Sequence, residues 1–274
     1  MAGHFWLSEC RTEGTGIDAY KGRVTLSSLD SSVLKLVDSY WAEFFGCAPD
    51  ALRTDTPQIV AHAGLADYVR CYLMGFGGAP IVSLPVDELE SSRAAIEQWH
   101  AGVVRLPALV EAIFGQRVAA RVGPAYVGYT DLKHFRPAFL SGTRGLTTQD
   151  EKAINALRDA CTVEEWEHGG SEFRPTEMAG VFKGHELAAL ASYQIWGQQI
   201  AHISIVTHPD FRRRGYATAA VGSLTQTVLE RTLVPQYRTL EGNVPSMAVA
   251  RRLGFVHYAT SLAIRFAFAR QGGK

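Results

Sequence analysis

The chain has 274 residues, enough for one large domain or for two smaller ones. Its 27 basic residues balance its 27 acidic residues, which argues against a nucleic-acid or membrane-surface partner. The sequence contains no apolar run of membrane-spanning length, no leader-like apolar stretch in residues 1–11, and four cysteines without a C-x-x-C pair. We therefore expect a cytoplasmic protein with reduced thiols and without a metal site.

The first half of the chain predicts helices mixed with strands. Apolar residues between positions 29 and 45 recur at helical spacing, with Asp30 or Ser31 as N-cap and Gly46 after the last turn. Further periodic segments predict strands over 58–63, 67–76, 79–84 and 125–129, and helices over 87–101 and 106–114. This order is typical of an α/β or α+β layered fold.

The second half predicts a similar alternation. A short strand is expected over 138–143, and the pattern Thr147-Thr148-x-x-Glu151 predicts a capping box for a helix that reaches about residue 160. The other expected helices are 164–168, 216–232 and 245–253, and the other expected strands are 178–182, 186–196, 200–207, 237–241, 256–259 and 262–268.

The end of the expected strand 200–207 is the most informative place in the sequence. A His208-Pro209-Asp210 turn follows it, and then come three arginines, Gly215 and the start of a helix. Backbone N–H groups at a helix start lack intrahelical partners and attract anions, and a glycine lets a phosphate approach the backbone. The segment therefore predicts a site for a phosphate-bearing cofactor, although a solvated charge cluster is the plain alternative.

Several motifs in this half resemble the GNAT superfamily of acyl-CoA-dependent N-acyltransferases. Arg212-x-x-Gly215-x-Ala217 resembles that family's (Q/R)-x-x-G-x-(G/A) loop. Asn243-x-x-Ser246 and the Leu-Gly-Phe segment at 253–255 resemble its second coenzyme A motif in order and separation. The resemblance covers about residues 137–270.

The resemblance implies a GNAT fold, with a central mixed and mostly antiparallel sheet flanked by helices. We expect this domain over 136–274 and a second α/β domain over 1–135. The segment 81–85 resembles 205–209, so the N-terminal half is either a degenerate GNAT-like repeat or an unrelated α/β domain. In the first case Asp87 and Glu88 would repel a phosphate, and this half would bind no cofactor.

Acetyl-CoA is the co-substrate that the resemblance implies. The end of the fourth family strand would pair with pantetheine, the arginine loop would hold the diphosphate, and the second motif would lie near the arm. The residues at these positions are Ile205, Val206, Thr207, Arg212, Arg213, Arg214, Gly215, Tyr216, Ala217, Thr218, Asn243 and Ser246.

The implied reaction is attack of an amine on the acetyl thioester, which requires a group that takes the amine's proton. His202 and Glu241 are the candidate bases. The family often has a tyrosine acid where this chain has Ala250, so Tyr258 or Tyr216 could replace it, or the thiolate could leave unprotonated.

The function that we expect is N-acetyl transfer to a small-molecule or amino-acid-like amine, since no acidic excess would attract a basic peptide. A longer acyl donor stays open, as does the oligomeric state, a homodimer included. The alternative is a catalytically silent module that binds coenzyme A as a sensor or partner domain. A P-loop nucleotide enzyme is disfavoured because no Lys-Ser/Thr pair follows the glycine.

Overall fold

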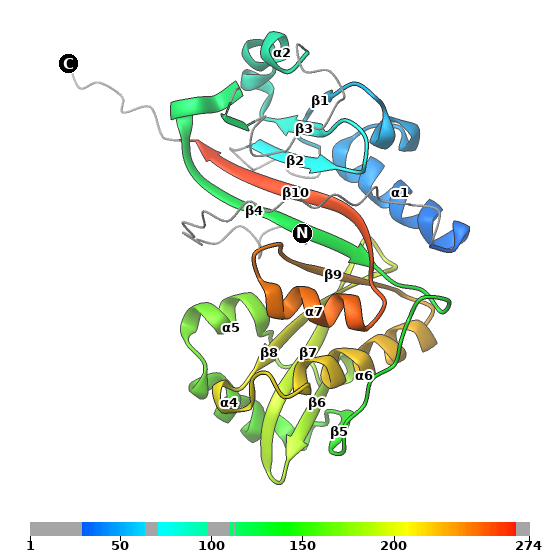
Figure 1. Cartoon of the computed structure of the whole chain (residues 1–274), viewed down its shortest axis with the longest axis vertical. Helices are drawn as coiled ribbons and strands as arrows, with labels where there is room; N and C mark the ends of the chain where they lie inside the picture. Colours follow the sequence, from blue (N-terminus) through cyan, green and yellow to red (C-terminus); the bar gives the residue numbers. More distant parts are fainter. Residues whose placement is uncertain (1–28, 64–70, 98–109, 112, 267–274) are drawn as a thin grey trace, which may run out of the picture.

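A single sheet of ten strands connects the two halves of the chain in this computed structural model, which describes residues 29–63, 71–97, 110–111 and 113–266 (Figure 1). The strands are β1 (Gln58–Ala61), β2 (Cys71–Gly75), β3 (Ile81–Leu84), β4 (Val118–Tyr129), β5 (Thr143–Gly145), β6 (Met178–Lys183), β7 (Glu186–Trp196), β8 (Ile200–Thr207), β9 (Val234–Leu240) and β10 (Val256–Phe266). Their order is β1-β3-β2-β10-β4-β9-β8-β7-β6-β5.

The pairs β1/β3 and β8/β9 are parallel, and the other pairs are antiparallel. A mixed, mostly antiparallel sheet flanked by helices is thereby confirmed. The helices are α1 (Ser31–Phe45), α2 (Leu89–Glu97), α4 (Glu151–Ala160), α5 (Val163–Gly169), α6 (Tyr216–Glu230) and α7 (Val244–Arg252).

The last strand of the chain lies in the middle of this sheet. Strand β10, from the C-terminal half, pairs with β2 on one side and with β4 on the other, and both of these strands belong to the N-terminal half. Strand β4 in turn pairs with β9 of the C-terminal half. Among the described residues the N-terminal half thus has no sheet of its own. The division at residues 135 and 136, and the degenerate repeat, stay predictions.

The helices cover both faces of the sheet, and the alternation of side chains along β8 shows which helix covers which face. Ile203 belongs to the core cluster beneath α6 and α7. Val206, on the opposite face, packs in the cluster with residues of α4, and Ile200 packs beneath α1 on that same face. Helix α1 and the pair α4–α5 therefore lie on one face of the sheet, opposite α6 and α7.

Several local predictions were wrong in detail. The strand expected over 138–143 forms later, as β5 from Thr143 to Gly145, while residue 138 lies against α6, where a Cβ on Gly222 would lie 2.7 Å from the Ala138 carbonyl oxygen. The two expected closing strands are one strand, β10, whose register against β4 shifts after His257, Ser261 and Arg265. Parts of the expected segments 67–76, 87–101, 106–114 and 262–268 lie outside the described residues.

The capping box before α4 is formed one residue earlier than expected. Thr147 is the N-cap, and its backbone N–H donates to the carboxylate of Asp150 rather than to that of Glu151. The short 3₁₀ turn Thr148–Asp150 thus precedes α4. The side chain of Arg144 also pairs with Asp150 through two bonds of 2.7 and 2.6 Å, which lowers the pKa of that carboxyl.

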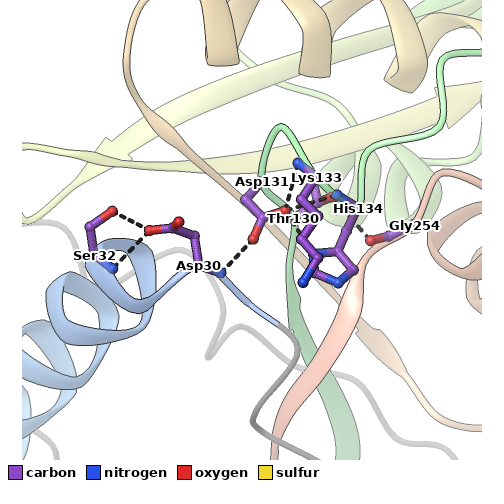
Figure 2. Close-up of polar contacts among 7 residues, drawn as sticks. All are labelled: Asp30, Ser32, Thr130, Asp131, Lys133, His134 and Gly254. Carbon is purple, nitrogen blue, oxygen red and sulfur yellow. Dashed lines mark hydrogen bonds and ion pairs between the residues drawn. The ribbon is translucent and has the colours of Figure 1, made fainter.

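A buried carboxylate joins the start of α1 to the loop after β4, as Figure 2 shows. Asp131 accepts a 2.7 Å bond from the backbone N–H of Asp30, the N-cap of α1, and another of 2.7 Å from Nδ1 of His134. Beside it, the Thr130 hydroxyl donates to the carbonyl oxygen of Gly254 at the end of α7 (Figure 2). These bonds tie α1 to the loop after β4, and that loop to Gly254 of the C-terminal half.

Candidate functional site

Two neighbouring parallel strands diverge at the centre of the C-terminal half. Strands β8 and β9 pair from Ile200 and Val234 as far as Ile203 and Tyr237. Beyond this point β8 is paired with β7 alone, and β9 with β4 alone. The divergence therefore begins immediately after Ile203, at the part of β8 in which the sequence places the cofactor.

The backbone of β8 presents polar groups to this divergence. His208 N donates to Ala188 O at 3.0 Å, so His208 and Ala188 form a hydrogen-bonded pair of the antiparallel ladder between β8 and β7. Because alternate residues of an antiparallel ladder share that role, Val206 also bonds β7, whereas Ile205 and Thr207 direct their N–H and C=O groups toward β9. Two of the three predicted strand residues thus have backbone groups that face the divergence.

The turn after β8 has the geometry of an anion site. Arg213 and Gly215 both adopt left-handed backbone angles, with φ of 61° and 84°. Ala219 N donates to Gly215 O, so the N–H groups before it have no intrahelical acceptor. A Cβ on Gly215 would meet only Leu140 Cδ1, at 3.9 Å, so the space beside this α-carbon is open. The N–H groups at the start of α6 belong to Tyr216, Ala217 and Thr218.

The three arginines of the turn differ in their surroundings. Arg212 Nε donates to the carbonyl oxygen of Thr207 at 3.3 Å, and its Nη2 lies 2.7 Å from Glu165 Oε1. Arg213 and Arg214 are exposed on the turn itself. The structure therefore separates one arginine that contacts β8 and α5 from two that stand beside the start of α6.

Helix α5 lies along the last residues of β8. Its Glu165 takes part in a capping box, since Thr162 N donates to Glu165 Oε2 at 3.0 Å, and this bond, with Arg212, lowers the pKa of the carboxyl. One turn later, a Cβ on Gly169 would come within 2.3 Å of the Ile205 carbonyl oxygen. The close approach of α5 to β8 at this point thus needs a glycine.

Asn243 and Ser246 lie at the start of α7. Asn243 is the N-cap, and its Oδ1 accepts from Ser246 N at 3.2 Å. The Ser246 hydroxyl is 2.9 Å from the hydroxyl of Tyr237, which occupies the last paired position of β9, and burial raises the pKa of Tyr237 to about 12. The sequence did not single out Tyr237, because it stood there as the first residue of an expected strand.

His202 lies in the core rather than at the divergence. Its side chain is 2% exposed, stacks on Trp196 with ring centroids 4.2 Å apart, and bonds Gln236 Oε1 through Nδ1 at 2.9 Å. Burial, together with the charge of Arg238, lowers its pKa to about 3. A ring with this pKa holds protons weakly at neutral pH, so the structure offers no support for His202 as the base.

Glu241 and Tyr258, the other predicted catalytic residues, lie apart from each other. Glu241 is exposed just after β9 and accepts a 3.0 Å bond from the Thr260 hydroxyl. Tyr258 is fully buried beneath α1, where its hydroxyl donates to Asp38 Oδ1 at 2.7 Å and burial raises its pKa far above the usual value. The structure thus does not bring the three predicted catalytic side chains together.

The comparison with protein families identifies this part of the chain. Residues 163–260 match the family model described as GNAT acetyltransferase. Residues 163–260 are the part of the chain that belongs to this family. The matched residues include the divergence, the arginine turn and α7, so the GNAT match contains every predicted cofactor residue.

Solved structures of GNAT proteins are similar to the chain at low identity. A GNAT-family acetyltransferase from Novosphingobium aromaticivorans is 23% identical over 54% of this chain and 66% of its own, with a TM-score of 0.42. One from Colwellia psychrerythraea is 13% identical over 87% of this chain and 97% of its own, with a TM-score of 0.49. One from Kribbella flavida is 16% identical over 58% of this chain and 62% of its own, with a TM-score of 0.42. The chain thus spans just under two thirds of the first and third structures. No curated protein matches the sequence.

Two features of the GNAT half bear on its chemistry. Ala250 is fully buried in the cluster beneath α7, where the family resemblance led us to expect a tyrosine. In the described part of the chain, no group of three or more His, Cys, Asp or Glu side chains could hold a metal ion, and no helix has the length and apolar character to cross a bilayer.

Proposed function

We propose that the chain is an acetyl-CoA-dependent N-acetyltransferase that acts on the amine of a small or amino-acid-like molecule. The observation on which this rests is the divergence of β8 and β9, where Ile205 and Thr207 direct their backbone N–H groups away from β7, beside the first N–H groups of α6. A strand edge beside a helix N-terminus suits a carrier with an amide-containing arm and a diphosphate.

The residues present fit such a carrier. The open space at Gly215 and the first N–H groups of α6 would accept the diphosphate, with Arg213 and Arg214 adding charge. The arm would follow the edge at Ile205 and Thr207. An N–H on this edge would polarise the thioester carbonyl, because a fixed donor stabilises the negative charge that develops on oxygen.

Proton transfer from the attacking amine needs a base that water and substrate can reach. Glu241 is exposed just after β9, whereas His202 is buried and its pKa is low. Of the two predicted bases, Glu241 is therefore the one that we retain. Since Ala250 provides no acid, we propose that the thiolate leaves as an anion, which a thiol pKa of about 8.5 permits.

We also propose that the N-terminal half shapes the acceptor side. Helix α1 packs on the same sheet face as Trp196 and Ile200, which precede the divergence along the chain, and the Asp131 bonds hold it there. This arrangement supports an acceptor site that residues from both halves line.

The test is to titrate the full chain with acetyl-CoA by calorimetry and to measure coenzyme A release with a panel of amines that includes free amino acids. We expect saturable binding and acceptor-dependent thiol release. Binding without release for any amine would favour the alternative of a silent coenzyme A module. An absence of binding would refute both functions.

A further inference from the structure

Arg212 contacts protein groups that neither Arg213 nor Arg214 reaches. Its Nε donates to the Thr207 carbonyl oxygen, at the end of β8, and its Nη2 forms the 2.7 Å ion pair with Glu165 of α5. The guanidinium therefore bridges the strand edge and the neighbouring helix. A planar group with several fixed donors can hold two acceptors at once in this way.

Glu165 is itself held in place. Its second carboxylate oxygen accepts from Thr162 N, and Thr162 Oγ1 accepts from Glu165 N at 3.1 Å, so the capping box restricts the side chain before Arg212 binds it. An ordinary surface ion pair contributes little because two flexible side chains must be ordered. In this pair the carboxylate is already ordered, and the arginine has an additional backbone acceptor.

Helix α5 contacts the divergent part of β8 at two points, one turn apart. Glu165 reaches Thr207 through Arg212, and Gly169 lies directly against the Ile205 carbonyl oxygen. These are the two residues whose backbone groups face the divergence. The distance between α5 and this edge is thus fixed by a glycine at one end and by the Arg212–Glu165 pair at the other.

We propose that Arg212 and Glu165 are positioning residues that set how closely α5 approaches the open edge of β8, and that they act on the arm of the acyl carrier rather than on its diphosphate. This inference rests on the proposed function. It divides the arginine turn, since Arg213 and Arg214 would bind the diphosphate directly while Arg212 would not.

The experiment compares two donors, acetyl-CoA and S-acetylpantetheine, which has the same arm but no diphosphate. Dissociation constants are measured by calorimetry for the variants Arg212→Gln, Glu165→Gln, their double mutant and Arg213→Gln. Glu167→Gln is the matched control, because it removes the same charge from an exposed position of α5. Urea unfolding of each variant shows whether the fold is intact.

We expect Arg212→Gln and Glu165→Gln each to weaken binding of both donors by about the same factor, roughly two- to fivefold, as for a partly exposed ion pair. The double mutant should bind both donors no more weakly than either single variant, because each single substitution already removes the contact that the two residues share. Arg213→Gln should weaken the binding of acetyl-CoA by about tenfold and leave the binding of S-acetylpantetheine unchanged.

A loss of affinity in Arg212→Gln that is confined to acetyl-CoA would make Arg212 a diphosphate ligand and overturn the inference. Additive losses in the double mutant, or a Glu165→Gln variant that behaves like Glu167→Gln, would also overturn it. If the wild-type chain binds neither donor, the proposed function fails instead. The two failures are therefore distinguishable.

Discussion

The substitution Gly215→Glu tests the diphosphate site most directly. With φ at 84°, any side chain at this position costs about 1–2 kcal/mol of conformational strain. A Cβ would meet only Leu140, at an ordinary contact distance, so steric overlap does not add to this loss of stability. A carboxylate at the start of α6 returns about 0.3–1 kcal/mol through the helix dipole, so the net loss of stability should be about 1 kcal/mol.

The effect on binding should be larger. A carboxylate about 5 Å from two phosphate charges, at a dielectric between those of water and a protein surface, opposes binding by roughly 2–3 kcal/mol, which is about thirty- to 150-fold in Kd. Calorimetric titration with acetyl-CoA measures this change. The control is Gly184→Glu in the β6–β7 turn, where φ is 64° and a Cβ would have no other atom within 4 Å. If Gly215→Glu bound acetyl-CoA as tightly as Gly184→Glu, the loop assignment would be refuted.

Two substitutions test the packing around the site. Gly254→Ala should cost about 3 kcal/mol or more in thermal unfolding, because φ is 82° and the new Cβ would lie 1.9 Å from the His134 carbonyl oxygen; an unchanged Tm would contradict this close approach. Tyr258→Phe should lower the free energy of unfolding by about 2 kcal/mol, because it removes a hydrogen bond to the Asp38 carboxylate, and equal urea midpoints for variant and wild type would show that this bond contributes nothing.

The elements around the cofactor site could be predicted because their signals are local. The apolar run that ends at His208-Pro209 gave β8 its observed bounds, and Gly215 marked the start of α6. The two halves of β10 could not be joined from sequence, because Thr260 and Ser261 interrupt the apolar pattern. In the structure the Thr260 hydroxyl bonds Glu241, the Ser261 hydroxyl bonds Arg238 of β9, and the strand continues through both residues.

The catalytic predictions depended on information that the sequence does not contain. Alternation correctly places His202 and Ser204 on one sheet face, but nothing local shows that His202 is buried, with its ring stacked on Trp196. The role of Arg212 was also hidden, since three consecutive arginines look alike until Glu165, far earlier in the chain, is seen beside one of them. Such contacts arise from tertiary packing, which local patterns do not encode.

The burial of His202 makes a prediction about stability and pH. Its pKa is about 3 in the folded chain and about 6.5 when unfolded, so the folded state binds fewer protons between these values. The stabilisation from a neutral His202 is complete above about pH 6.5. It is lost as the pH falls toward 3, by at most about 1.4 kcal/mol per pH unit.

The variant His202→Gln cannot titrate, so the difference in free energy of unfolding between wild type and variant isolates this residue. Urea unfolding at pH 7.5, 6 and 5 should show the wild type losing stability relative to the variant as the pH falls. A general base that works near neutrality needs a folded pKa close to the ordinary one, and then the difference would stay constant over this range. A constant difference would thus contradict the buried, neutral ring and restore His202 as a candidate base.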